Sequence, residues 1–207
     1  MNIAVIGAAG GVGRQVVSQL GQAGHQVRAL VRTQAQADMM TLHGAMPNMG
    51  DLTGEWKQVL DGADAVVWAA GAGMSGQYQA IDGDALENVA DTLSQQGPKR
   101  FVVVSSMGVD RPEAMPPFLI PVLKVKAVSD AHVQESGLDF TIVRPGGLSD
   151  QPGTGRVQIG LQAPRGQIAR EDVARVVVAC LMDDNTVGKT FEVIGGDMDV
   201  HDALAAI

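Results

Sequence analysis

Three glycines near the start of the chain have the spacing of a phosphate-binding turn. Gly7, Gly10 and Gly13 stand three residues apart, directly after the apolar run Ile3–Ile6 and at the start of a helical pattern. Glycines suit such a turn because one bends the chain tightly, one lets a diphosphate approach the main chain, and one lets the helix lie close to the strand. Free N–H groups at the helix start would face the negative charge. The stretch therefore predicts a dinucleotide site.

The glycine spacing departs from the commoner G-x-G-x-x-G pattern because Ala9 fills the place of its second glycine. The context supports the prediction, since Val12, Val16 and Leu20 fall on one face of the expected helix, which begins at Gly11. A strand, turn and helix with a purely structural role is the alternative.

The end of the second strand-like run predicts which dinucleotide is bound. An NAD-selective site has an Asp or Glu there for the ribose 2′-hydroxyl, whereas a 2′-phosphate needs a cation. Arg32 and Thr33 follow the run Val27–Val31, and the nearest carboxylate, Asp38, lies inside the next helix. We therefore expect NADP(H) to be preferred over NAD(H). The alternative is that Arg32 is an ordinary surface arginine.

Small or polar residues follow two further strand-like runs. They are Gly50, Asp51 and Leu52 after the third run, and Ala69, Ala70 and Gly71 after the fourth. At the carboxyl ends of strands that flank a ligand crevice, such residues permit close contact with adenine and ribose. Asp51 could equally cap a helix that begins near Gly54.

Apolar runs of strand length alternate with segments of helix length along the whole chain. Strands are expected at Ile3–Ile6, Val27–Val31, Ala45–Met49, Ala65–Ala70, Phe101–Val104, Phe140–Val143 and Phe191–Ile194. Helices are expected at about Gly11–Ala23, Gln34–Leu42, Glu55–Leu60, Ala80–Gln96, Phe118–Ser136, Arg170–Met182 and His201–Ala206. This alternation predicts an α/β fold with a doubly wound, mostly parallel sheet in the order 3-2-1-4-5-6, extended by a seventh strand, and helices on both faces. Pro47 places the third strand at a sheet edge.

The least regular stretch lies at residues 150–167, after the sixth strand, and contains two prolines and several glycines. Because ligands bind beyond the carboxyl ends of such strands, this stretch could cover a substrate as a small lid, or simply connect two elements. The length of 207 residues fits one domain, residues 1–207, that includes this region.

Composition restricts the partners and the compartment. The formal net charge of −8 argues against nucleic acid as a partner, and no apolar stretch or leader predicts a membrane span or export. A single cysteine, Cys180, fits a reducing cytoplasm and a core position. The four histidines are scattered, so no metal site is expected. We expect a cytoplasmic monomer or homodimer that acts on a small molecule.

Several motifs together resemble the atypical short-chain dehydrogenase/reductases. They are Ile-Gly-Ala-Ala-Gly-Gly-Val-Gly at 6–13, Leu-Val-Arg at 30–32, Gly-Asp-Leu at 50–52, Val-Val-Val-Ser-Ser-Met-Gly at 102–108, and the block at 136–148 that ends in Arg-Pro-Gly-Gly-Leu. The chain is most similar to the small NAD(P)-binding group that contains NmrA-like proteins and flavin or biliverdin reductases. The resemblance implies a Rossmann domain that holds NADP with Gly7, Ala9, Gly10, Gly11, Val12, Gly13 and Arg32, and nicotinamide near Ser105, Pro145, Gly146 and Gly147.

The catalytic residues of the wider family are only partly present. That family uses a serine after the fifth strand and a Tyr-x-x-x-Lys on the next helix. Ser105 and Ser106 occupy the serine region and Lys126 matches the lysine, but Val122 stands in place of the tyrosine. Lys126 could bind the nicotinamide ribose, or could be a surface charge. Tyr78, in the loop after the fourth strand, is a possible substitute proton donor or an ordinary surface residue.

The missing tyrosine leaves two hypotheses. In one, the protein transfers hydride from NADPH to an acceptor that needs no tyrosine acid, such as a quinone or flavin, while a serine orients the substrate. In the other, it binds NADP(H) without turnover and reports redox state to a partner, as an NmrA-like regulatory protein. A nucleotide-sugar epimerase is disfavoured because little chain follows the sixth strand.

Overall fold

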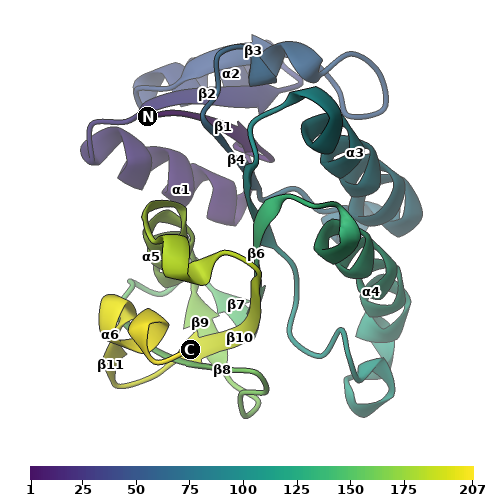
Figure 1. Cartoon of the computed structure of the whole chain (residues 1–207), viewed down its shortest axis with the longest axis vertical. Helices are drawn as coiled ribbons and strands as arrows, with labels where there is room; N and C mark the ends of the chain where they lie inside the picture. The colour runs from purple at the N-terminus through teal and green to yellow at the C-terminus, as the bar shows by residue number, and fades with distance from the viewer.

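The computed structural model describes residues 1–207 (Figure 1). Nine strands form one sheet, in the order β11-β8-β10-β6-β5-β4-β1-β2-β3. Their bounds are β1 (Asn2–Ile6), β2 (Gln26–Val31), β3 (Met46–Met49), β4 (Ala65–Trp68), β5 (Arg100–Val104), β6 (Asp139–Pro145), β8 (Arg156–Gly160), β10 (Lys189–Gly195) and β11 (Met198–Asp199). A separate short pair joins β7 (Gly147–Ser149) to β9 (Gln167–Ala169). The expected α/β fold and its strand order 3-2-1-4-5-6 are confirmed.

Helices cover both faces of the sheet (Figure 1). They are α1 (Gly11–Gln22), α2 (Gln34–Leu42), α3 (Leu86–Gln96), α4 (Ile120–Glu135), α5 (Arg170–Met182) and α6 (Val200–Ala205). Side chains of α1, α2, α5 and α6 share one apolar core, and those of α3 and the end of α4 share the other. No helix is long and apolar enough to cross a lipid bilayer.

The first strand shows why its residues Ile3–Ile6 are all apolar. Ile3 and Val5 belong to the core beneath α1 and α5, whereas Ala4 and Ile6 belong to the core beneath α3. Successive side chains of a strand point to opposite faces, so a central strand of a doubly covered sheet buries every residue. The turn after β1 is therefore fixed at the middle of the sheet, at its carboxyl edge.

Three expected helices differ from the observed ones. The segment expected at 55–60 is a 3₁₀ turn over Lys57–Leu60, and the helix expected from Ala80 begins as a π-helix, Gln79–Ala85, before α3. The helix expected from Phe118 begins at Ile120, after a 3₁₀ turn at Pro117–Leu119. Apolar periodicity alone does not distinguish these tighter or wider turns from an α-helix.

The stretch at 150–167 contains regular structure that we did not expect. Its strand β8 pairs antiparallel with β10, and β11 extends the sheet beyond it. The preceding turn is tied to the start of α5, because main-chain N–H groups of Gly153, Thr154 and Gly155 donate to the carboxylates of Glu171 and Asp172, each at 2.8 Å. The two acids thus anchor this loop as well as favouring the helix N-terminus.

A buried arginine closes the opposite, amino edge of the sheet. Arg100 donates from Nη1 to the carbonyl of Asp139 and from Nη2 to the Thr186 hydroxyl, both at 2.8 Å, and also from Nη2 to the carbonyl of Cys180 at the end of α5. Burial lowers the pKa of Arg100 and raises that of the Cys180 thiol to about 12. Cys180 is a core residue, as expected.

Arg100→Met is expected to destabilise the protein strongly without touching the cavity described below. The change removes a buried donor that bonds the carbonyls of Asp139 and Cys180 and the Thr186 hydroxyl, which costs about 3 kcal/mol and lowers the melting temperature by on the order of 10 °C. Thermal and urea denaturation measure the loss. Arg14→Met, at an exposed position of α1, is the matched control. A loss no larger than that of the control would contradict the assigned role.

Candidate functional site

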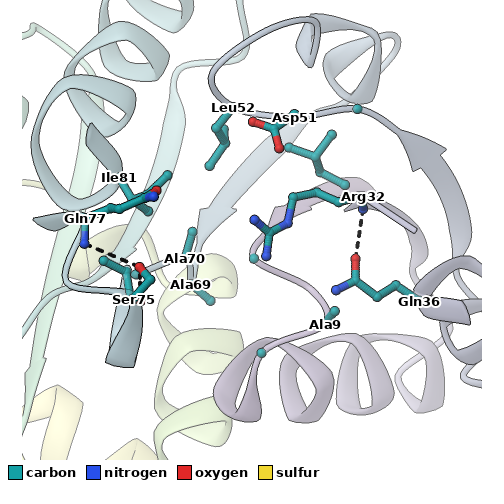
Figure 2. Close-up of a pocket in the computed structure, with 16 residues that line it drawn as sticks. Ala9, Arg32, Gln36, Asp51, Leu52, Ala69, Ala70, Ser75, Gln77 and Ile81 are labelled. Atoms are coloured by element: carbon teal, nitrogen blue, oxygen red, sulfur yellow. Dashed lines mark hydrogen bonds between the residues drawn. The ribbon is translucent and has the colours of Figure 1, made fainter. Parts of the chain in front are cut away.

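A cavity of about 460 Å³ lies at the carboxyl edge of the sheet, over the ends of β1, β2, β3 and β4 (Figure 2). Its lining combines the glycine turn, the start of α2 and the loops after β3 and β4. The lining residues are Gly7, Ala9, Gly10, Leu30, Arg32, Gln36, Gly50, Asp51, Leu52, Ala69, Ala70, Gly71, Ala72, Ser75, Gln77 and Ile81. The cavity is largely built from main chain and small side chains, with a few polar groups that converge on it.

Two glycines of the turn, Gly7 and Gly13, leave no room for a side chain. Gly7 has a φ of +85°, and a Cβ added there would lie 2.3 Å from the nitrogen of Ala70. A Cβ on Gly13 would lie 2.1 Å from the Gly7 carbonyl oxygen, so this glycine lets α1 approach β1. Gly10 donates its N–H to the Gly7 carbonyl at 2.9 Å and precedes α1 without a side-chain cap. The first turn of α1 therefore keeps free N–H groups for an anion.

Arg32 extends its side chain into the cavity from the end of β2 (Figure 2). Its main-chain N–H donates to Gln36 Oε1 at 2.8 Å, which holds the start of α2 against the strand end. The hydroxyl of Thr33 accepts from the N–H of Gln36 at 3.3 Å and caps α2. Thr33 thus serves the helix and does not line the cavity. The Thr-x-x-Gln spacing of a capping box could have identified Gln36 from sequence.

Asp51 also faces the cavity, from the loop after β3 (Figure 2). Its Oδ1 accepts from the N–H of Thr53 at 2.8 Å and from the Thr53 hydroxyl at 2.6 Å. These bonds, together with the charge of Arg32, hold the pKa of Asp51 below its usual value. No helix begins near Gly54, and the 3₁₀ turn that follows begins at Lys57, after Trp56, without a side-chain cap. The alternative that Asp51 caps a helix is therefore wrong.

A buried polar cluster lies at the end of β5. The hydroxyl of Ser105 donates to Asp130 Oδ2 at 3.0 Å, and the same oxygen accepts from Arg144 Nε at 2.9 Å and Nη2 at 2.8 Å. Burial raises the pKa of Asp130, and the charge of Arg144 opposes this rise. Asp130 was not predicted, because nothing in a helical pattern marks which carboxylate faces inward.

Lys126 is not a surface charge, so that alternative is wrong. Its Nζ lies 2.9 Å from Asp82 Oδ1, and both side chains are buried. The second oxygen of Asp82 accepts from the N–H of Ala72, also at 2.9 Å. Asp82 was not identified from sequence, because its partners lie in the loop after β4 and in α4. It lies in the π-helix that follows Tyr78, and Tyr78 is half-buried at that end.

The remaining residues predicted near the nicotinamide lie at the ends of β5 and β6. The Ser106 hydroxyl donates to the carbonyl of Met107 at 3.4 Å, and the Met107 N–H donates to the Pro145 carbonyl at 2.9 Å. Gly146 and Gly147 donate to main-chain carbonyls of β10 and of the turn before β9. Their backbone is therefore held rigidly beside Ser105.

The structure brings together only part of the predicted site. The predicted residues that line the cavity are Gly7, Ala9, Gly10, Arg32, Gly50, Asp51, Leu52, Ala69, Ala70 and Gly71. Those outside its lining are Gly11, Val12, Gly13, Thr33, Ser105, Ser106, Lys126, Pro145, Gly146 and Gly147. Lining residues that we did not predict are Leu30, Gln36, Ala72, Ser75, Gln77 and Ile81. Four of these belong to the segment after β4, whose path depends on tertiary contacts. No group of three or more metal-binding side chains is present.

The fold and the cavity define a nucleotide-binding protein of the Rossmann type. Residues 7–184 match a family model described as NAD(P)H-binding, so the chain belongs to this family. It is 34% identical to a Bacillus subtilis (strain 168) protein named as an uncharacterized sugar epimerase, over 99% of both chains. A putative NAD-dependent epimerase/dehydratase from Bacillus halodurans has a similar structure, with a TM-score of 0.96, 33% identity and full coverage of both chains.

An anaerobillin reductase from Escherichia coli O157:H7 shares the fold at a TM-score of 0.81 and 23% identity, over 96% of this chain and 99% of that one. These similarities agree with the resemblance to the atypical short-chain dehydrogenase/reductases. The chain thus has an NAD(P)-binding, reductase-like fold.

Proposed function

We propose that this protein binds NADP(H) in preference to NAD(H) and uses NADPH to reduce a small conjugated acceptor such as a quinone or flavin. The observation that carries the cofactor preference is the guanidinium of Arg32, which extends into the cavity at the end of β2. A cation at this position is suited to a 2′-phosphate, whereas a carboxylate there would repel it.

The surroundings of Arg32 support this preference. The first turn of α2 begins directly after it, and the N-terminus of a helix favours a negative charge. Asp51 lies near Arg32, in the loop after the neighbouring strand β3, where its carboxylate is suited to accept from an adenine amino group. Its Oδ1 is already fixed by Thr53. In this arrangement the two charged groups contact different parts of one nucleotide.

In this proposal Ser105 and Lys126 lie in the part of the site that holds the nicotinamide. NADPH supplies the hydride when bound, while Lys126 contacts the nicotinamide ribose and Pro145 packs beside the ring. The Ser105 proton is committed to Asp130, because the Asp130 oxygen that it contacts also accepts from Arg144 and cannot itself donate. Ser105 is thus left with acceptor lone pairs, which orient a ligand N–H or O–H group.

A conjugated acceptor fits this set of groups. No tyrosine stands at position 122 to donate a proton, so the reduced product must be able to delocalise its negative charge until water protonates it. Quinones and flavins meet this condition, and an aldehyde does not. A protein of the same fold from Escherichia coli O157:H7 is named as an anaerobillin reductase, which supports a role in reducing a small molecule.

The second candidate function is NADP(H) sensing without turnover. The observation that favours it is the same Val122, together with the engagement of the Ser105 hydroxyl by Asp130. Epimerase activity, which the names of two relatives suggest, needs an acid–base residue to move the proton of a sugar hydroxyl. With Val122 in the tyrosine position, this function is disfavoured.

An acceptor panel distinguishes the two candidates. NADPH oxidation is followed with quinones, a flavin and aldehydes, for the unaltered protein and for Ser105→Ala and Lys126→Met. We expect the unaltered protein to oxidise NADPH with a quinone or flavin. The rate is expected to fall at least about tenfold in Lys126→Met, because this variant loses one charge-assisted hydrogen bond. Lys124→Met is the control, because Lys124 lies on the same helix but is exposed. Tight NADPH binding with no turnover on any acceptor would favour the sensor.

A further inference from the structure

The buried carboxylate of Asp82 links two parts of the candidate site that the sequence shows no reason to connect. Only 2% of the residue is exposed. Its Oδ1 pairs with Lys126 Nζ on α4 and its Oδ2 accepts from the N–H of Ala72, which follows β4, both at 2.9 Å. Both oxygens of one carboxylate are therefore used, each by a different element.

The Ala72 contact fixes one wall of the cavity. Ala72, Ser75, Gln77 and Ile81 all line it, and Figure 2 shows the last three on the side opposite Arg32. The Ser75 hydroxyl donates to the Ala72 carbonyl at 2.8 Å and accepts from the N–H of Gln77 at 3.3 Å. A chain of hydrogen bonds thus runs from Asp82 along this wall.

The wall is also in close contact with the carboxylate itself. A Cβ added to Gly71 would lie 3.2 Å from Asp82 Oδ1. Asp82 stands in the π-helix Gln79–Ala85, and a wide turn of this kind, which costs stability, is frequent at functional sites. The π-helix brings Asp82 inward and leaves Asp84, two residues later, exposed.

The Lys126 contact leaves part of the ammonium free. Asp82 is the one partner of Lys126 Nζ in the structure, and an ammonium has three donors. Taking both charges out of water is costly, and a buried pair is weak evidence for stability. A pair that leaves donors unused is better explained if these donors contact a ligand.

We propose that Asp82 is a positioning residue for cofactor binding: it holds the Gly71–Gln77 wall through Ala72 and directs the ammonium of Lys126 toward the nicotinamide ribose. This inference rests on the proposed cofactor function and names a residue outside the family motifs described above. Asp82 acts through Ala72 and Lys126 and does not itself contact the cofactor.

The test compares ligands that do and do not reach Lys126. Dissociation constants are measured for NADPH and for 2′,5′-ADP, which keeps the adenosine and the 2′-phosphate but lacks the nicotinamide ribose. Asp82→Asn keeps an acceptor for Ala72 and removes the charge that holds Lys126. We expect NADPH binding to weaken about tenfold in this variant, and 2′,5′-ADP binding to change less than twofold. We expect Lys126→Met to give the same pattern. The double variant of Asp82 and Lys126 is expected to weaken NADPH binding no more than either single variant does.

Asp84→Asn is the matched control, since Asp84 lies on the same π-helix but is exposed and contacts only Gln79. Unfolding of the ligand-free variants is measured in parallel. A merely structural ion pair would lower the melting temperature but leave the ratio of NADPH to 2′,5′-ADP affinity unchanged, and this result would overturn the proposal. If Asp82→Asn does not fold, the unchanged ratio in Lys126→Met would overturn it.

The test of Asp82 can fail or succeed independently of the proposed preference for NADP(H). If the unaltered protein binds NADH as tightly as NADPH, the cofactor preference fails. The effect of Asp82 is then measured with NADH against 5′-ADP, which lacks the same ribose. A preserved tenfold loss for the whole dinucleotide would still support the positioning role.

Discussion

Gly13→Ala is expected to abolish dinucleotide binding, with the largest loss of any single substitution in the site. The added Cβ would lie 2.1 Å from the Gly7 carbonyl oxygen and 2.9 Å from Ala8 Cα, both main-chain atoms that cannot rotate away. Helix α1 must move away from β1, and its free N–H groups move with it. We expect NADPH affinity to fall by roughly 100-fold or more, together with a loss of about 3 kcal/mol in the free energy of unfolding.

Fluorescence titration of NADPH and urea denaturation measure the two effects of Gly13→Ala. Gly21→Ala is the matched control, because Gly21 lies later in the same helix and its Cβ would meet only the His43 carbonyl, at 3.3 Å. If Gly13→Ala bound NADPH as well as the control did, the turn would not be the diphosphate site.

Arg32→Ala is expected to weaken NADPH binding by about 10- to 100-fold and to leave NADH binding within about twofold. The guanidinium is a charged donor suited to the 2′-phosphate, and a charge-assisted hydrogen bond contributes about 1.5–3 kcal/mol. NADH lacks that phosphate, so it does not lose the contact. Isothermal titration of both dinucleotides measures the difference.

Lys189→Ala removes a cation of equal charge from the opposite edge of the sheet, at the start of β10, and controls for the change in net charge. A decrease of equal size for NADPH and NADH in Arg32→Ala would indicate that Arg32 supports the cavity without recognising the phosphate. The preference would then have to come from another group.

Much of the fold could be predicted because its signals are local. Each central strand, such as β1, is a continuous apolar run, and the bounds expected for α2 and α5 match the observed ones. The glycine turn and Arg32 were found for the same reason, since both are set by neighbouring residues and by the end of a strand. These are features that a few residues determine on their own.

The rest of the site depends on partners far apart in the chain. Asp82 and Lys126 are separated by more than forty residues, and nothing near either one indicates that both are buried. Asp130 likewise acquires its role from Ser105 and Arg144. Strand β8 was not predicted because its apolar pattern is short and its strand conformation depends on pairing with β10. Buried polar contacts of this kind are decided by tertiary structure.

The central claim is that the cavity at the carboxyl edge of the sheet binds a dinucleotide and selects the 2′-phosphate through Arg32. Titration of the unaltered protein with NADPH and NADH under identical ionic strength tests it most directly. We predict that the dissociation constant for NADPH is at least about tenfold lower, as one charge-assisted contact requires. Equal affinities, or tighter binding of NADH, would contradict the claim.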